Sequence, residues 1–137
     1  MIDLTAFRNA VQQLSSAIQE QAREPERVLL RAGLIQTFEF TYELSHKMLK
    51  RYLMSVTPSP EQIDLLTFEG LIRLGDEAGL LLSPIAVWKD FRKARTETSH
   101  TYNEEKAVAV LNRIPAFEQE AKHLLERLRE RIESHDE

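Results

Sequence analysis

The stretch IQTFEFTYELSHKMLK, residues 35–50, lies at the centre of the longest helical pattern in the sequence. Apolar side chains recur there at helical spacing, and the same face continues before and after it, at Val28, Leu34, Ile35, Phe38, Tyr42, Leu49 and Leu53. Pro25 suits the first turn of this helix, which is predicted to run to about Met54. At roughly 1.5 Å per residue, such a helix would be about 45 Å long.

The rest of the chain also favours helices. Only four glycines and five prolines occur among 137 residues, which leaves little material for turns and predicts few, long elements. Apolar residues step by three and four through residues 4–18, and further helices are predicted over residues 68–78, 84–99 and 103–132. The one clear break is SVTPSP, residues 55–60, because two prolines two positions apart cannot continue a helix. The sequence therefore predicts an all-α fold in one domain.

Short polar and glycine signals mark the predicted helix ends. Thr67 is expected to open the short helix, and Gly79 is expected to end it as a C-cap. Ser83 is predicted to cap the next helix, with Pro84 in the first helical position. Asn103 is predicted to cap the last helix, whose first turn then holds acidic residues where the helix dipole favours them.

Composition excludes several classes of protein. The net charge is −4, so any contact with phosphate must be local rather than driven by the charge of the whole chain. The chain has no cysteine, which excludes disulfides and a thiolate nucleophile and fits a reducing cytoplasm. No apolar run approaches membrane-spanning length, and the N-terminus is not a signal peptide. We therefore expect a cytoplasmic protein that does not enter the membrane.

The candidate functional residues lie in the segment ARTETSHTYN, residues 94–103, at the end of a predicted helix. Arg95 can hold an anion through an always-charged planar fork, and His100 can exchange a proton near neutral pH. Tyr102 can stack on a base or donate a hydrogen bond. Lys93 and Thr96 flank the arginine and complete a predicted binding set for a phosphate-bearing ligand.

The spacing within this segment leaves two arrangements open. Five residues on a helix turn through about 500°, so Arg95 and His100 would lie roughly 140° apart if the helix continued through both. They can converge if the helix ends near residues 98–100, or across a two-fold axis between two chains. The alternative interpretation is a solvated helix end, with His100 close to the negative end of the dipole.

Other clusters carry weaker signals. Glu39 and Glu43 lie one turn apart and are interpreted as a salt-bridged surface rather than as an acid–base pair. His100 and Glu104 have the spacing of two metal ligands, but a third ligand is missing, so no metal site is predicted. The sequence holds neither a Walker loop nor a Rossmann glycine run, and we expect no cofactor.

Two blocks of the sequence resemble a known family. The run RTETSHTYNEEK, residues 95–106, resembles the Arg-x4-His-x-Tyr signature of the HEPN superfamily, most closely the branch of nucleotidyltransferase substrate-binding proteins. Residues 35–50 resemble the first long helix of that branch, and the resemblance extends from about Leu4 to Leu128. It implies a single HEPN-like domain over residues 1–137, folded as a four-helix up-and-down bundle with one additional short helix.

The first function that the resemblance implies is that of a binding subunit. Such a subunit forms a homodimer and pairs with a separate minimal nucleotidyltransferase, as part of a two-component or toxin–antitoxin system. The catalytic carboxylates of that partner normally form an Asp-x-Asp motif, which this sequence lacks. Arg95 would hold phosphate and His100 would hydrogen-bond the nucleotide or acceptor. In related pairs the partner adds AMP to a tyrosine of this motif, and Tyr102 is the matching position.

The alternative implied function is that of a metal-independent ribonuclease toxin, which the nucleotidyltransferase partner would neutralise. His100 would act as general acid or base, Arg95 would stabilise charge on the phosphorus, and Tyr102 would complete the site. One histidine cannot do both jobs, so two chains would have to share a cleft. Thr96 stands where many active relatives carry a more strongly polar residue, and we therefore favour the binding subunit.

Overall fold

The computed structural model describes residues 2–136, with side chains up to Ser134, and these residues form helices and loops without a strand. Four helices are long: α1 (Thr5–Arg23), α2 (Val28–Ser55), α5 (Ile85–Glu97) and α6 (Glu104–Asp136). The connection from α2 to α5 contains α3 (Pro60–Asp64) and α4 (Phe68–Glu77), and a 3-10 turn, η1 (Thr98–His100), follows α5. The predicted all-α fold is confirmed, with two short helices where the sequence indicated one and a partial turn.

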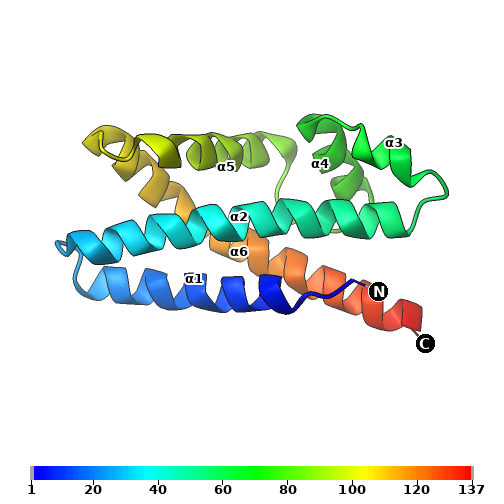
Figure 1. Cartoon of the computed structure of the whole chain (residues 1–137), viewed down its shortest axis with the longest axis horizontal. Helices are drawn as coiled ribbons and strands as arrows, with labels where there is room; N and C mark the ends of the chain where they lie inside the picture. The colour runs from blue at the N-terminus through cyan, green and yellow to red at the C-terminus, as the bar shows by residue number, and fades with distance from the viewer. Residues whose placement is uncertain (1, 137) are drawn as a thin grey trace.

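The four long helices alternate in direction along the chain. In Figure 1, α1 and α2 form an antiparallel pair, α5 lies on the other side of α2, and α6 crosses behind them toward the C-terminus. The short helices α3 and α4 gather beside α5, over the C-terminal half of α2. None of the helices within residues 2–136 combines the length and the apolar character that crossing a bilayer would require.

An aromatic cluster joins three of the long helices. Phe117 of α6 lies edge-on to Phe38 of α2 and to Phe91 of α5, with ring centroids 5.2 and 5.3 Å apart. Trp88 of α5 is fully buried and packs edge-on against Phe91 at 5.5 Å. Edge-to-face pairs of this kind stabilise a core beyond the area that they bury. They fix α5 against α2 and α6, and so fix the position of the segment that follows α5.

Two predicted helix starts are wrong, and each has a physical reason. Pro25 lies in a turn closed by the bond from Arg27 N to the Glu24 carbonyl, 3.0 Å, and α2 begins only at Val28. Ser83 does not cap α5 through its side chain; its backbone N–H instead donates to Glu120 of α6 at 2.9 Å. That buried carboxylate holds the chain extended up to Pro84, so α5 begins at Ile85.

The other predicted ends are confirmed by their hydrogen bonds. The Thr67 hydroxyl accepts a bond from the backbone N–H of Gly70 at 3.1 Å, and Asn103 accepts one from Lys106 N at 3.1 Å. Gly79 has a φ of 75°, the left-handed conformation that ends a helix without strain only at glycine.

Candidate ligand-binding site

The segment 94–103 is positioned by the end of α5 and by η1. The α-helix ends at Glu97, and η1 carries the chain through His100 before α6 begins at Glu104. The Thr98 hydroxyl donates to the carbonyl of Arg95 at 2.6 Å and accepts a bond from its guanidinium at 3.3 Å. The helix thus ends in the region that the sequence indicated, because a threonine hydroxyl satisfies a carbonyl of the last turn.

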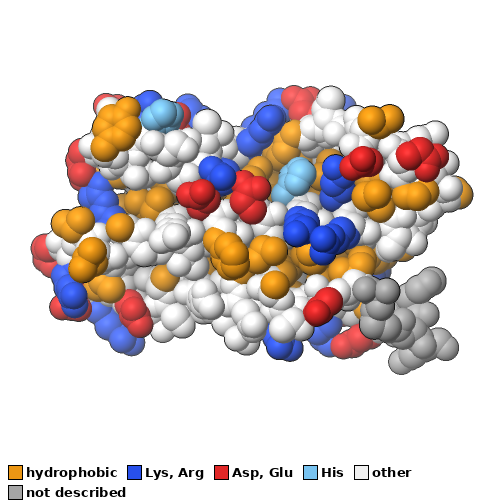
Figure 2. Space-filling view, in the orientation of Figure 1, with side chains coloured by type: hydrophobic (Ala, Val, Ile, Leu, Met, Phe, Trp, Pro, Cys, Tyr) orange, Lys and Arg blue, Asp and Glu red, His pale blue; other side chains and the backbone are white. Residues whose placement is uncertain are grey.

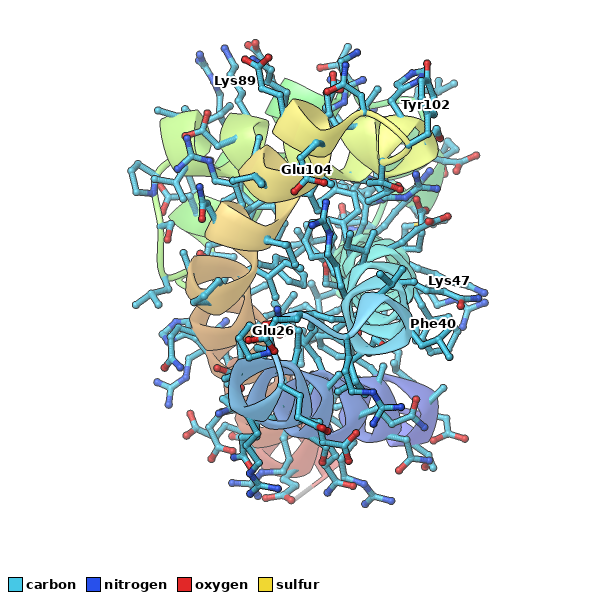
Figure 3. The ribbon with its side chains drawn as sticks, turned by 90° about the vertical axis from the view of Figure 1, so that its left-hand side faces the viewer. Glu26, Phe40, Lys47, Lys89, Tyr102 and Glu104 are labelled. Carbon is cyan, nitrogen blue, oxygen red and sulfur yellow. The ribbon has the colours of Figure 1, made fainter. Side chains whose placement is uncertain are left out.

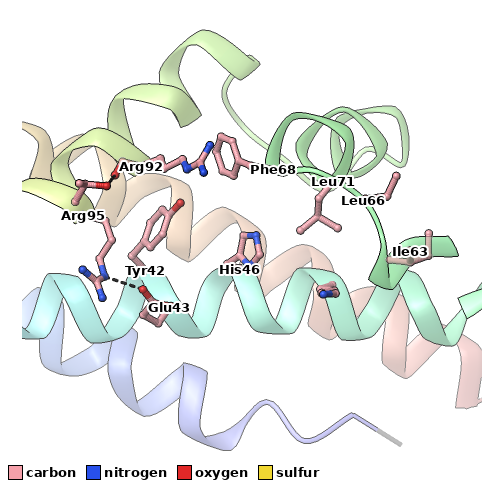
Figure 4. A pocket seen from close by; sticks show the side chains of 11 residues that line it. Tyr42, Glu43, His46, Ile63, Leu66, Phe68, Leu71, Arg92 and Arg95 are labelled. Carbon is pink, nitrogen blue, oxygen red and sulfur yellow. Dashed lines mark hydrogen bonds and ion pairs between the residues drawn. The ribbon is translucent and has the colours of Figure 1, made fainter. Parts of the chain in front are cut away.

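Arg95 crosses from α5 to α2. Its Nε donates to Glu43 Oε1 at 2.7 Å (Figure 4). Its Nη2 lies 3.4 Å from Glu39 Oε1. The arginine side chain is 26% exposed, so both ion pairs are only partly screened by water. The interpretation of the two glutamates as a salt-bridged face is confirmed, and their partner comes from another helix.

His100 and Tyr102 lie apart from Arg95. Their rings pack edge to face with centroids 6.1 Å apart, after the last turn of α5; Figure 3 shows Tyr102 at the edge of the molecule. Tyr102 is 87% exposed, whereas His100 is half-buried. Within one chain His100 does not line the pocket that contains Arg95. The spacing left open a site within one chain and a site formed between two chains. Because His100 does not line this pocket, a pocket site that uses both Arg95 and His100 would need a second chain.

Lys93 and Thr96 are separated by α5 itself. Lys93 lies with Asp90 and Arg113 around a small hollow of about 110 Å³ between α5 and α6. Thr96 is on the side of Arg95, and its hydroxyl donates to the carbonyl of Arg92 at 3.1 Å. Arg95 and Thr96 therefore line one pocket, and the other three predicted residues lie outside it.

That pocket has a volume of about 430 Å³ and lies between α2, the short helices and α5. We call it the α2–α5 pocket; its polar lining is Tyr42, Glu43, His46, Lys50, Arg92, Arg95 and Thr96, and its apolar lining is Ile63, Leu66, Phe68 and Leu71. Figure 2 shows basic and histidine side chains gathered around an apolar hollow on this face. Three cations and one carboxylate thus meet in a chain whose net charge is −4.

Burial keeps two of the lining groups neutral. Burial raises the pKa of Tyr42 to about 12, so its phenol remains protonated. Burial also lowers the pKa of His46 below its usual value of 6.5, and nearby Lys50 and Arg92 lower it further while Glu43 opposes them. Both groups can therefore act as neutral hydrogen-bond donors at neutral pH.

Of the eleven pocket residues, only Arg95 and Thr96 were assigned a binding role from the sequence; the residues missed include Tyr42, His46, Phe68 and Arg92. The sequence did contain one indication of this site. Tyr42, His46 and Lys50 are spaced four residues apart, so their polar side chains lie along one face of the helix. Nothing in the sequence indicated that α4 and α5 would close over this line.

The fold and the segment 95–102 define a HEPN-like helical bundle. The sequence matches the family described as "Nucleotidyltransferase substrate binding protein like" over residues 2–130, and the chain belongs to that family. The resemblance found in residues 35–50 and 95–106 is thereby confirmed.

One named relative and one solved structure, both from Haemophilus influenzae, are similar to the chain. The relative, named "Probable ribonuclease HepT", is 43% identical over 100 residues, which are 73% of this chain and 68% of that protein. The solved structure is that of HI0074, described as the fold of a substrate binding domain of a nucleotidyltransferase. It superposes with a TM-score of 0.86 at 34% identity and covers 93% of this chain and 99% of its own.

Proposed function

We propose that this protein is the substrate-binding subunit of a cytoplasmic two-protein system, in which it pairs with a separate minimal nucleotidyltransferase. Its family is named for that role, and the solved HI0074 structure is described in the same terms. The sequence contains no Asp-x-Asp pair to hold catalytic metal ions, so nucleotidyl transfer requires the second polypeptide. Of the candidate residues in this segment, Arg95 and Thr96 line the α2–α5 pocket, and we place them beside the bound substrate.

The observation that carries this proposal is the exposure of Tyr102. At 87% exposed, its side chain stands out from the turn before α6, where the active site of another protein can reach the hydroxyl. We propose that Tyr102 accepts the nucleotidyl group. Its oxygen attacks the α-phosphorus of a nucleoside triphosphate, the bond to pyrophosphate breaks, and the phenolic proton passes to a base on the partner.

The test is a transfer assay with the partner encoded in the neighbouring reading frame. The two purified proteins are mixed with ATP, and the intact mass of this chain is measured. We expect a complex of the two chains and the addition of one or more AMP groups. Tyr102→Phe should abolish the addition, and Tyr52→Phe, the same change on α2, should not. Transfer to Tyr102→Phe at the native rate would refute the assignment.

A second candidate function is ribonuclease activity, and a specific observation favours it. The 43% identical relative is named a probable ribonuclease, and this chain carries Arg95 and His100 at the spacing of the HEPN signature. The ribose 2′-hydroxyl would give its proton to His100 of one chain and attack the adjacent phosphorus, and the 5′-oxygen would leave with a proton from His100 of the second chain. Since His100 does not line the pocket that contains Arg95, we propose that this activity requires a homodimer that brings the two residues together.

This candidate is tested by expressing the chain alone and following RNA integrity and growth. RNA loss with the native chain but not with His100→Ala would establish the nuclease. Light scattering at micromolar concentration gives the oligomeric state, and a monomer that cleaves RNA would contradict the shared cleft.

A further inference from the structure

The hydroxyl of Tyr42 is a hydrogen-bond donor held in the α2–α5 pocket without a protein partner. The residue is only 6% exposed, and its ring packs against Phe117 and Trp88 with centroids 5.9 and 6.4 Å away. Figure 4 shows the hydroxyl directed away from α2 into the pocket. Within residues 2–136 no hydrogen bond reaches it. The ring is fixed in the core, and the hydroxyl is not one of the fully buried polar atoms that lack a partner, so water in the pocket can reach it.

Arg92 is a second unpartnered donor in the same pocket. Its guanidinium carbon lies 4.7 Å from the centre of the Phe68 ring, and no carboxylate of the described residues lies within ion-pair distance. The other two cations of the pocket are paired: Arg95 with Glu43 at 2.7 Å and Lys50 with Asp64 at 2.9 Å. Arg92 is therefore the cation of this pocket that an anion can reach without displacing a carboxylate.

His46 is the third donor, and its surroundings add an apolar wall. Its ring lies nearly parallel to that of Phe68, with centroids 6.3 Å apart and planes inclined by 13°. Among the side chains that the structure describes, none is hydrogen-bonded to the imidazole. Ile63 and Leu71 continue the wall beyond the two rings.

These observations together indicate the chemistry of the ligand. None of these three donors has a protein acceptor among the residues that the structure describes, and a group with several acceptor oxygens can bond the hydroxyl, the guanidinium and the imidazole in place of water. A phosphate group meets that requirement, and arginine is the cation best suited to it. The apolar wall next to these donors needs a planar, weakly polar partner. The volume of about 430 Å³ lies in the range of small-molecule sites.

We propose that the α2–α5 pocket binds a nucleoside phosphate, with Tyr42, His46 and Arg92 on the phosphate and the base against the rest of the apolar lining, Ile63, Leu66 and Leu71. The phosphate assignment follows from the three donors. The choice of a nucleoside as the ring-bearing part rests on the proposed partnership with a nucleotidyltransferase. Tyr102 is not involved, so this is a site of the chain itself and separate from the nucleotidyl acceptor.

The test is calorimetric titration of the purified full chain with AMP, with adenosine and inorganic phosphate as its two part-ligands. AMP should bind more tightly than either part-ligand. Tyr42→Phe removes one hydrogen bond and should weaken AMP binding by about tenfold, and Arg92→Gln removes a charged donor and should weaken it by at least about tenfold. Tyr52→Phe and Arg8→Gln are the same substitutions outside the pocket and should leave the affinity unchanged.

Several results would overturn the proposal. One is that the chain does not bind AMP, and another is that neither Tyr42→Phe nor Arg92→Gln changes its affinity for AMP. Inorganic phosphate that binds as tightly as AMP would also contradict the proposal. If Tyr42→Phe lowers the melting temperature, the imidazole resonances of His46 in the native chain provide a second measurement. They should shift on addition of AMP, and unmoved resonances would refute the site.

Failure of this inference can be told apart from failure of the proposed function. The transfer assay reports on Tyr102 and the partner chain, whereas calorimetry uses this chain alone. Transfer to Tyr102 without AMP binding by the isolated chain would refute the pocket and leave the partnership standing. AMP binding by the isolated chain without transfer to Tyr102 would refute the proposed partnership and leave the pocket standing.

Discussion

Arg95 Nε of α5 donates to Glu43 Oε1 of α2 at 2.7 Å, and this contact decides how available the arginine is. Glu39 lies 3.4 Å from the same guanidinium, so two carboxylates hold the cation that the sequence assigns to phosphate binding. An anion must compete with both of them. Arg92, one turn earlier on α5, has no such competitor among the described residues.

We predict that releasing Arg95 strengthens anion binding. In the double variant Glu39→Gln, Glu43→Gln the guanidinium loses both ion pairs, and AMP affinity should rise by about threefold to tenfold, since exposed pairs contribute about 1 kcal/mol or less each. Calorimetry at low salt measures the change. The matched control is Glu20→Gln on α1. An affinity that falls, or that rises equally after Arg95→Gln is added, would contradict the prediction.

Glu120 of α6 should be important for stability although it is a lone buried carboxylate. It is fully buried and accepts bonds from the backbone N–H groups of Leu82 and Ser83 at 2.8 and 2.9 Å. Glu120→Ala leaves both donors without a partner and should lower the free energy of unfolding by about 3 kcal/mol. Glu120→Gln keeps one acceptor and should cost less.

Urea denaturation followed by circular dichroism measures these losses. Glu130→Ala, an exposed change on the same helix, is the control and should stay within about 0.5 kcal/mol of the native chain. Equal stability of Glu120→Ala and Glu130→Ala would show that the carboxylate does not hold the α4–α5 connection.

Two glycines in helices should respond to alanine in opposite directions. A Cβ at Gly33 meets no atom within 4 Å, so Gly33→Ala should raise the free energy of unfolding by about 0.5–1 kcal/mol through helix propensity. A Cβ at Gly75 would lie 3.1 Å from Leu49 Cδ1 and 3.3 Å from Leu81 Cδ1. Both leucines are buried, so Gly75→Ala should lower stability by about 1 kcal/mol. Melting curves of Gly33→Ala and Gly75→Ala test this prediction. If both variants were more stable than the native chain, or both less stable, the packing argument would be refuted.

The lowered pKa of His46 predicts a loss of stability on mild acidification. Because the folded-state pKa lies below the usual 6.5, the unfolded chain binds the proton first as the pH falls. The contribution of the neutral His46 side chain to the free energy of unfolding is fully present above about pH 6.5. It is lost as the pH falls through the folded-state pKa of His46. The carboxyl pKa values of Glu69 and Glu104 are lowered by Lys89 and Arg31, so their contributions are lost only below about pH 4.5.

The measurement is the free energy of unfolding between pH 5 and 8 for the native chain and for His46→Gln. The variant should show a flatter profile over this range. Identical slopes in the native chain and His46→Gln would show that burial does not disfavour the imidazolium.

The sequence determined the helices and most of their ends. Spacings of three and four residues produced the amphipathic faces, and the caps at Thr67, Gly79 and Asn103 depend on atoms within a few residues, so each could be read locally. The two wrong starts, at Pro25 and Ser83, fell where the helix begins later than its local signal. At Ser83 the reason is a carboxylate 37 residues away, which took the backbone N–H.

The tertiary structure alone decided which side chains share a pocket. Tyr42, Phe68 and Arg92 come from three different helices, and the aromatic packing that sets the position of α5 brings them together. The same packing turned Arg95 toward Glu39 and Glu43 and left His100 beside Tyr102. Helical periodicity shows which residues share a face of one helix, but which faces meet depends on contacts that are distant in sequence.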